Sequence, residues 1–469
     1  MIDSGDTAWV LVSTALVMIM TPALGFFYGG LVGKKNALAM IGQSFVVLAL
    51  ISVQWVLLGY TLAFGPDAFH GLIGNLSYLG LNNVGANPDP SYASTIPASV
   101  YMLFQMMFAV ITPALITGAI VGRMKFSSFV VFIVAWATFV YDPIAHWVWG
   151  STGWLHSLGI LDFAGGTVVH ISSGVAALAA AMVVGPRLGF GKKKFEPHNS
   201  TYVLLGASLL WFGWFGFNAG SALTSGALAA NAFMTTNTAT AAAALAWMCM
   251  SWYYTRKPSI IGAASGAVAG LVAITPASGF VNVWGALAVG IGAGVFCFLA
   301  VSFRNKTKID DSLDAWGVHG VGGTWGALAT GLFATVAANS LGGNGLFYGN
   351  PHQFLVQAIG VGASWGYSFV MTCVILKVID RVIGLRVKPE EEEKGLDISH
   401  HGEPAYSDKD DLETTEPRVV RLVISDADRE LIAGLIRQQG SITVDVSSGK
   451  VVEGIPELSR VSGSLSKST

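Results

Sequence analysis

The charged residues of this chain are gathered into short clusters that separate long apolar stretches. Up to residue 376, every Lys and Arg falls in one of five clusters, and a sixth group begins at Lys377. The five clusters are Lys34 with Lys35; Arg123 with Lys125; Arg187 with Lys192, Lys193 and Lys194; Arg256 with Lys257; and Arg304 with Lys306 and Lys308. The intervals between clusters run from roughly 50 to 90 residues, which is enough for two spans of about 20 apolar residues and a turn. The pattern therefore predicts paired membrane-spanning helices.

Counting these spans gives the predicted topology. One span before Lys34 and five out-and-back pairs make eleven transmembrane helices. Because clusters of Lys and Arg mark cytoplasmic loops, we expect the N-terminus outside and the C-terminus inside the cell. The N-terminal sequence MIDSGDTAWVLVSTALVMIM has no positively charged start, so its apolar run is predicted to be the first span rather than a signal peptide.

Composition agrees with an all-α polytopic membrane protein. The 469-residue chain is 53% hydrophobic and 12% charged, with a mean hydropathy of +0.59, values that differ from those of soluble proteins. The net charge of -2 offers no basic surface for nucleic acid. Cys249, Cys297 and Cys373 stand in separate apolar segments without zinc-type spacing, so they are interpreted as small buried apolar residues. The 57 glycines predict closely packed helices.

Few ionisable residues remain inside the predicted spans. No Lys, Arg or Glu lies near the middle of any span, which argues against an ion-coupling site built on carboxylates. Ionisable groups inside a membrane are costly, so those that do remain are candidates for function. Asp162 begins the predicted fifth span, where capping of free helix N–H groups is an alternative role. The ionisable residues that remain are Asp142, His146, Asp162, His170, Asp314 and His319.

Two of these residues, His170 and His319, are predicted to meet. His170 lies eight residues beyond Asp162, which is about 12 Å deeper and near the middle of an apolar core about 30 Å thick. His319 lies eleven residues after Lys308 and approaches from the opposite side. The stretches DFAGGTVVH and DAWGVHG both place Asp ahead of Gly and His, which favours an inverted repeat of five spans in each half. We therefore expect a hydrogen-bonded histidine pair at the midplane.

Eight motifs follow one another in order over nearly all of residues 7–406. They are GFFYGGLVGKKN, FQMMFA, HWVWG, DFAGGTVVHISSG, WFGWFGFNAGSAL, ITPASGFV, DAWGVHGVGG and DISHHGEPAYS. Together they resemble the ammonium transporter family of Amt, Mep and Rh proteins, and within it the prokaryotic Amt type with a C-terminal extension. The resemblance implies an eleven-helix protomer, pseudo-twofold between spans one to five and six to ten. It also implies a homotrimer in the cell membrane, with one pore in each protomer.

The same resemblance implies roles for residues on the outer side. Trp149, Phe108 and Ser221 resemble the site that recruits ammonium, and Phe108 and Phe217 resemble the stacked phenyl gate beneath it. Gln105, Trp214 and Thr275 are further pore or vestibule candidates.

Deeper in the predicted pore, His170 and His319 resemble the family's twin histidines. Asp162 resembles the aspartate that builds the outer site. The stretch between Trp149 and Asp162 is longer than the family's pattern, which leaves the alignment of the outer vestibule open.

The function that these residues predict is ammonium transport, with no cofactor, no catalytic residue and no metal. A cation over Trp149 is held by cation–π attraction worth about 0.5 to 2 kcal/mol. NH4+ is then expected to lose its proton near the gate, so that NH3 crosses the apolar pore and the proton travels along the histidine pair. Methylammonium is a further candidate substrate, and the net transported species, NH4+ or NH3, stays open.

Two other classes of function stay open as alternatives. One is an ammonium sensor that signals through its cytoplasmic tail. The other is a membrane metalloenzyme, for which the two histidines, without a nearby carboxylate or cysteine, make an incomplete ligand set.

The predicted domains are the membrane domain at 1–388, a cytoplasmic regulatory region at 389–412 and a cytoplasmic appendage at 413–469. Residues 377–406 resemble the family's regulatory region, which implies a PII-type signalling protein as a cytoplasmic partner. The resemblance stops after about residue 412.

The appendage is predicted to be a small α/β-like fold of unknown function. β-branched residues at 419–424 are typical of a strand, and ITVDV is typical of a second strand. Between them, an apolar face made by Leu431, Ile432, Leu435 and Ile436 predicts a helix. The final segment RVSGSLSKST is expected to be disordered.

Overall fold

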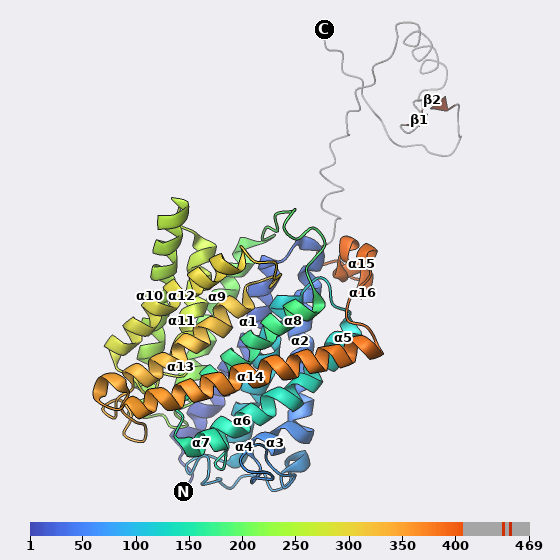
Figure 1. Cartoon of the computed structure of the whole chain (residues 1–469). Helices are drawn as coiled ribbons and strands as arrows, with labels where there is room; N and C mark the ends of the chain where they lie inside the picture. The colour runs from blue at the N-terminus through green and yellow to red at the C-terminus, as the bar shows by residue number, and fades with distance from the viewer. Residues whose placement is uncertain (407–442, 446–449, 453–469) are drawn as a thin grey trace. The chain divides into compact units, whose positions relative to one another are not determined.

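The computed structural model describes residues 1–406 and the short segments 443–445 and 450–452. The chain divides into two compact units, Met1–Ala405 and Tyr406–Thr469. The first unit consists of long helices packed side by side, as Figure 1 shows.

In the second unit, the described segments are two short strands. β1 (Thr443–Asp445) and β2 (Lys450–Val452) pair in an antiparallel arrangement. β1 confirms the strand expected in ITVDV. The strand expected at 419–424, the helix that follows it and the C-terminal segment lie outside the described residues.

The first half of the helical unit runs from α1 to α8. Its helices begin where polar caps or loops end and continue through uninterrupted apolar sequence. Asp3 shows this at the start of α1, where its side chain accepts the backbone N–H hydrogen bond of Asp6. The elements are α1 (Ser4–Leu31), η1 (Lys34–Asn36), α2 (Ala37–Gln54), η2 (Trp55–Gly59), α3 (Tyr60–Phe64), η3 (Leu79–Leu81), α4 (Ala98–Ile120), α5 (Phe126–Trp136), η4 (Ala137–Tyr141), α6 (Asp142–Trp149), α7 (Trp154–Leu158), η5 (Gly166–Ile171) and α8 (Ser172–Val184).

The second half continues to α14 and is followed by two short helices. In Figure 1, α14 is the long helix across the front of the unit, and it packs against α8, α13 and α5. The elements are α9 (Ser200–Gly220), α10 (Ala227–Thr255), α11 (Ile260–Ile274), α12 (Val283–Arg304), η6 (Trp316–Gly320), α13 (Val321–Phe333), η7 (Leu346–Tyr348), α14 (Pro351–Val382), α15 (Pro389–Lys394) and α16 (Leu396–His400).

The helices have the length and apolarity of membrane spans. Within the described residues, eight helices are long and apolar enough to cross a membrane, and α11 is a shorter apolar helix of 15 residues. Large apolar side chains such as Phe212, Trp284 and Val378 point outward, as expected for a surface that faces lipid. The structure is thus the predicted all-α polytopic fold, while the count of eleven spans and the orientation remain predictions.

Both predicted pore histidines lie in π-helical turns. His170 lies in η5 and His319 in η6, and each turn continues into a helix of 13 residues, α8 or α13. π-helical turns are rare, and they are frequent at functional sites. The recurrence of a π-helical turn followed by a 13-residue helix supports the predicted internal repeat.

The two helices that follow these turns cross without intervening side chains. A Cβ atom on Gly174 of α8 would collide with the backbone of Gly320, just after His319. A Cβ atom on Gly323 of α13 would lie 3.0 Å from the Cβ of His170. Small residues at these two positions therefore let each helix approach the histidine of the other half.

Two of the basic clusters meet at Asp310, at one end of the unit. Arg123, between α4 and α5, is fully buried and donates hydrogen bonds to the carbonyl oxygens of Ala119, Gly185 and Asp310. Burial lowers the pKa of Arg123 to about 10. Arg187 donates from Nε and NH2 to the Asp310 carboxylate at 2.9 and 2.7 Å. We call this end of the unit the basic end.

The segment after α14 packs on the same basic end. Glu392 of α15 accepts a hydrogen bond from the backbone N–H of Leu188 at 2.7 Å. Asp397 of α16 accepts from the backbone N–H groups of Leu38 and Ala39 at 3.1 and 2.8 Å, and it thereby caps the start of α2. The C-terminal segment thus contributes directly to the packing of a membrane-spanning helix.

Cysteine exposure corrects one expectation from the sequence. Cys297 is buried as expected, but Cys249 is exposed and Cys373 is only partly buried. Both lie on long apolar helices, α10 and α14, outside the sets of residues that each helix buries. An apolar segment predicts a membrane helix, but it does not say which side of that helix faces lipid.

Candidate functional site

A pocket of about 270 Å³ lies at the end of the unit opposite the basic end. The sequence-predicted residues Phe108, Trp149, Asp162, Ser221 and Gln105 all line it, although they come from four separate parts of the chain. The remaining lining residues are mainly aromatic or apolar, and they include Tyr92, Tyr101, Phe104, His156, Ile160, Phe163 and Leu223. The pocket therefore combines aromatic walls with a few polar groups.

The indole of Trp149 is held in place at one wall of this pocket. Its Nε1–H donates to the backbone carbonyl of Asp162 at 2.9 Å. Its ring meets the ring of Phe108 edge to face, at 5.8 Å between centroids and 90° between planes. The unusually long stretch between Trp149 and Asp162 forms the short helix α7, so the extra residues do not separate the two ends. The hydrogen bond holds Trp149 beside Asp162.

Polar atoms at the pocket come from Ser221 and Gln105. The Ser221 hydroxyl donates to the carbonyl of Phe217 at 2.8 Å, so its oxygen lone pairs stay available as acceptors. The Gln105 amide donates to the Tyr101 hydroxyl at 3.3 Å, while its Oε1 has no hydrogen-bond partner among the described residues. Both side chains can therefore accept a hydrogen bond from a small cation in the pocket.

Two phenyl rings close the inner end of the pocket. Phe108 of α4 and Phe217 of α9 lie 4.2 Å apart between ring centroids, with 33° between their planes. Both side chains are buried. Stacked rings at this distance leave no room for a molecule between them, so passage requires at least one ring to rotate.

Behind the phenyl rings lies a line of stacked rings that ends at the two histidines. His170 stacks on Phe217 at 6.1 Å and on Trp214 at 5.4 Å. His319 lies 5.4 Å from His170 between ring centroids. Both imidazoles are almost completely buried, with exposed fractions of 1% and 2%. The structure thus brings together residues of both halves that the sequence predicted to meet.

The predicted hydrogen bond between the two imidazoles is wrong for this structure. Neither ring nitrogen of His170, nor Nδ1 of His319, has a hydrogen-bond partner among the described residues. The two rings lie at 30° to each other. His170 also stacks on Trp214 and Phe217, at 26° and 24° between ring planes, and this packing restricts the orientation of its ring.

Trp214 and Thr275 form a buried pair beside His170. The Trp214 Nε1–H donates to the Thr275 hydroxyl at 2.8 Å, and that hydroxyl donates to the carbonyl of Leu271. Thr275 therefore fixes the indole that stacks on His170. Thr275 thus supports Trp214 through this hydrogen bond.

Asp162 caps the π-helical turn that carries His170. Its carboxylate accepts hydrogen bonds from the backbone N–H groups of Gly165, Gly166 and Thr167 at 2.8, 2.6 and 2.8 Å, and from the Thr167 hydroxyl. The capping role considered for Asp162 is confirmed. Because its backbone carbonyl also holds Trp149, Asp162 links the pocket to the histidine turn.

Sequence reasoning missed the counterpart of Asp162 in the second half. Asp311, rather than Asp314, accepts hydrogen bonds from the backbone N–H groups of Ala315 and Trp316 at the start of η6. Asp314 instead forms an ion pair with Arg304. The signal that could have found Asp311 is spacing: it precedes His319 by eight residues, as Asp162 precedes His170.

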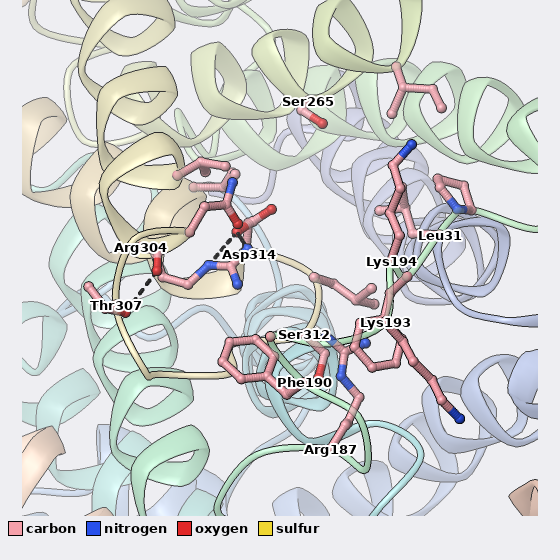
Figure 2. Close-up of a pocket in the computed structure, with 18 of the residues that line it drawn as sticks. Leu31, Arg187, Phe190, Lys193, Lys194, Ser265, Arg304, Thr307, Ser312 and Asp314 are labelled. Carbon is pink, nitrogen blue, oxygen red and sulfur yellow. Dashed lines mark hydrogen bonds and ion pairs between the residues drawn. The ribbon is translucent and has the colours of Figure 1, made fainter. Parts of the chain in front are cut away.

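A second pocket, of about 480 Å³, opens at the basic end. Figure 2 shows Arg304 with Asp314 on one side of it, Lys193 and Lys194 on the other, and Arg187 below. Its wall also includes Val318, which immediately precedes His319 in η6. The second pocket thus reaches the residue that precedes His319 in the chain.

Metal ligands do not gather at either end of this line. Within residues 1–406, no group of three or more His, Cys, Asp or Glu side chains is placed to hold a metal ion. The two histidines are accompanied by aromatic rings, which are not metal ligands.

The fold and the site define a polytopic helical membrane protein in which two halves join an aromatic pocket to a pair of buried histidines. A family model described as the Ammonium Transporter Family matches residues 8–406. The chain belongs to this family, which is a family of transporters rather than of enzymes.

Individual relatives cover nearly the same part of the chain. An ammonium transporter of Bacillus subtilis is 50% identical over 405 residues, which are 86% of this chain and 99% of the relative. The crystal structure of Saccharomyces cerevisiae Mep2 matches with a TM-score of 0.78 and 38% identity, over 83% of this chain and 89% of Mep2. A structure titled Sensor Amt Protein matches with a TM-score of 0.77 and 32% identity, over 84% of this chain and 98% of that protein.

Proposed function

We propose that this protein transports ammonium by capturing NH4+ in the aromatic pocket, removing its proton and passing NH3 along the two histidines. The observation that carries the proposal is the continuous line from the pocket, through Phe108 and Phe217, to His170 and His319. Relatives of this chain are named ammonium transporters, which supports the substrate.

Capture requires an attraction that is weak enough to be reversible. A cation above the face of Trp149 gains about 0.5 to 2 kcal/mol, depending on how far it is desolvated. Ammonium also has four N–H donors, and the oxygens of Ser221 and Gln105 at the same pocket accept hydrogen bonds. Recruitment of ammonium by Trp149, Phe108 and Ser221 follows from these contacts.

The phenyl gate supplies selectivity through its lack of polar groups. A permanent cation such as K+ must leave its hydration shell to pass Phe108 and Phe217, and two phenyl rings replace little of that hydration. Ammonium can lose a proton and continue as neutral NH3. The cost of desolvation therefore excludes ions, such as K+, that cannot lose a proton.

His170 and His319 interact with the molecule that has passed Phe108 and Phe217. A neutral imidazole accepts a hydrogen bond at one nitrogen and donates at the other, so it can bind NH3 or relay a proton. Both ring nitrogens of His170 lack another partner among the described residues, which leaves them available for such exchange. Whether the proton follows NH3 determines whether transport is electrogenic.

A sensor is the second candidate function. The observation in its favour is the likeness to a structure titled Sensor Amt Protein. The hydrogen bonds of Glu392 and Asp397 at the basic end offer a physical route by which occupancy of the pore could reach the C-terminal segment. Transport and sensing can coexist in one chain.

The remaining assignments form part of the same proposal. We place the protein in the cell membrane as a homotrimer, with the aromatic pocket outside and the basic end inside. Residues 389–412 act as a regulatory region, a PII-type signalling protein is the cytoplasmic partner, and methylammonium is a candidate second substrate. The clustering of basic residues at one end supports the orientation, because such clusters mark the cytoplasmic side.

The test is ammonium-evoked current in proteoliposomes, with K+ pulses as the control for selectivity and an internal pH dye in the same vesicles. We expect a saturable response to ammonium and none to K+. His170→Ala should change the size or selectivity of the response, whereas His352→Ala, at an exposed histidine, should not. A pH change without current would indicate electroneutral NH3 conduction.

Two outcomes would contradict the proposal or redirect it. Equal responses to ammonium and K+ would contradict the proposal that Phe108 and Phe217 exclude permanent cations. Absence of both current and pH change, together with ammonium binding that alters protease access to the C-terminal segment, would favour the sensor.

A further inference from the structure

A carboxyl group that the proposed pathway does not use lies buried inside a membrane-spanning helix. Asp142 begins α6 within the candidate span Phe126–Leu158, and its side chain is completely buried. Its Oδ2 accepts a hydrogen bond from the Gln54 amide at 2.8 Å, and its Oδ1 has no partner among the described residues. No ion pair of Asp142 with Lys, Arg or His is found in that part of the chain.

The complete burial of Asp142 determines whether its carboxyl group is charged or neutral. An isolated carboxylate inside a membrane protein is costly, and a single amide hydrogen bond compensates little of that cost. A proton removes the charge and turns the acid into a donor. Asp142 is therefore expected to be neutral, and the sequence-based argument against membrane carboxylates does not hold for this residue.

One turn further along α6, His146 has a free ring nitrogen. Its Nδ1 lies 2.9 Å from the carbonyl of Ala63, which can only accept, so Nδ1 carries the hydrogen. Its Nε2 is left as a proton acceptor without a hydrogen-bond partner and lies 3.7 Å from Oδ1 of Asp67. Protonation of Nε2 would therefore be stabilised by the adjacent carboxylate.

Asp67 connects the imidazole of His146 to solvent. Its side chain is 31% exposed and accepts from the backbone N–H groups of Gly71 and Phe69 at 2.8 and 3.1 Å. Partial burial on its own raises the pKa of Asp67, but these hydrogen bonds outweigh it, so the pKa lies below its usual value. Asp67 is thus an anionic end point that can attract protons from solvent.

The groups that face this row from neighbouring elements are mostly uncharged. Tyr141 on η4 and Tyr367 on α14 are phenols, and the Tyr367 hydroxyl donates to a backbone carbonyl. Gln54 on α2 contributes an amide whose Oε1 has no partner among the described residues. His70, beside Asp67, is the remaining ionisable neighbour at the solvent end.

We propose that Asp142 is a proton-carrying group of the transport cycle and that it exchanges its proton with solvent through His146 and Asp67, along a branch separate from His170 and His319. The proton leaves the Asp142 carboxyl and adds to Nε2 of His146, which gives a carboxylate and an imidazolium; the imidazolium then releases it to water beside Asp67. Asp142 and His146 lie four residues apart, which is about 6 Å along the axis of α6, and the proposed transfer passes through one bridging water. The proposal rests on the transport function proposed above.

The test uses infrared difference spectra and ammonium flux of the full chain in proteoliposomes. A protonated carboxyl group gives a C=O stretch that shifts on H/D exchange, and we expect such a band in the parent and its loss in Asp142→Asn. The asparagine keeps an oxygen for the Gln54 amide but cannot lose a proton. Thr138→Val is the matched control, because it removes another acceptor of Gln54 and leaves the carboxyl group in place.

The flux data then decide whether the proton moves during transport. We expect several-fold slower flux and a flattened pH profile in Asp142→Asn, and parent behaviour in Thr138→Val. His146→Gln, whose amide can still donate to the Ala63 carbonyl, should keep the band and slow its H/D exchange.

Each result has a defined consequence. If the band survives in Asp142→Asn, or if the band is lost while the flux and its pH profile match the parent, the proposal is overturned. If Asp142→Asn fails to fold, unchanged exchange of the band in His146→Gln overturns it, and slowed exchange supports it. A parent chain that transports no ammonium refutes the proposed function instead, and the infrared band then still reports whether Asp142 carries a proton.

Discussion

Asp162 and Asp311 occupy equivalent positions in the two halves of the protein, each eight residues before a buried histidine. Each accepts backbone N–H hydrogen bonds where a π-helical turn begins, Asp162 at η5 and Asp311 at η6. The two histidines therefore approach each other because two capped turns, related by the internal repeat, aim them at the same place.

Removal of Asp162 should be more destabilising than removal of Asp311. Hydrogen bonds to a charged group contribute about 1.5 to 3 kcal/mol each, and buried N–H groups left without a partner add to the cost. We expect Asp162→Ala, which loses four such hydrogen bonds, to cost about 6 kcal/mol or more and Asp311→Ala, which loses two, to cost about 3 kcal/mol or more. Thermal unfolding of the purified protein in detergent measures both.

Asp314→Asn is the matched control for these caps. Asp314 pairs with Arg304 at the partly exposed basic end, and such pairs contribute about 0 to 1 kcal/mol. A loss at Asp314 as large as that at Asp311 would contradict the assignment of Asp311 as the cap.

The close crossing of α8 and α13 gives a second prediction. Gly174→Ala places a methyl group against the backbone of Gly320, which cannot move without shifting His319. We expect a loss of about 1 to 3 kcal/mol in stability, together with altered ammonium flux. Gly362 on α14 has open space around its Cα, so Gly362→Ala should be neutral or stabilising. If Gly174→Ala and Gly362→Ala had the same stability and the same ammonium flux, α8 and α13 would be less closely packed at Gly174 than the structure shows.

Much of this arrangement could be predicted from the sequence, because it depends on position along apolar spans. The all-α membrane fold follows from the spacing of the basic clusters, and the meeting of His170 and His319 follows from equal depth reached from opposite ends. Phe108 and Trp149 also meet as the family resemblance implied.

What the sequence did not reveal depends on tertiary packing. The ring orientation of His170 is restricted by Trp214 and Phe217, so the expected hydrogen bond to His319 could not be judged from spacing. Arg123 was expected in a loop but is fully buried, because carbonyls from distant segments satisfy its donors. Neither π-helical turn has a sequence signature, since the change from α to π hydrogen bonding reflects local packing.

Recruitment at the aromatic pocket predicts a change in apparent affinity. Trp149→Leu removes the ring face that holds the cation, so the half-saturating ammonium concentration should rise by about 2- to 30-fold, equivalent to about 0.5 to 2 kcal/mol. Ammonium titration of the proteoliposome response measures this change. Trp284→Leu, at an outward-facing tryptophan that is 76% exposed, should leave the concentration unchanged. A Trp149→Leu protein with parent affinity would place recruitment elsewhere.

The ion pair at the basic end predicts a dependence of stability on pH. Burial on its own raises the pKa of Asp310, but the hydrogen bonds and charge of Arg187 outweigh it, so the pKa of Asp310 lies below its ordinary value of 3.8. A depressed acid pKa stabilises the folded state fully above pH 3.8, and that contribution disappears as the pH falls through the lower, folded-state pKa.

Unfolding of the parent and of Asp310→Asn at several pH values tests this linkage. The parent should be more stable than the variant at pH 7, and the difference should narrow below about pH 4 because the carboxyl group in the parent becomes protonated. Asp380→Asn, near the end of α14, provides a comparison without a buried ion pair. A difference that stays constant down to the lowest pH would show that the stabilisation comes from the uncharged contacts of residue 310. Arg187 would then stabilise the basic end by packing and backbone hydrogen bonds, without a contribution from charge.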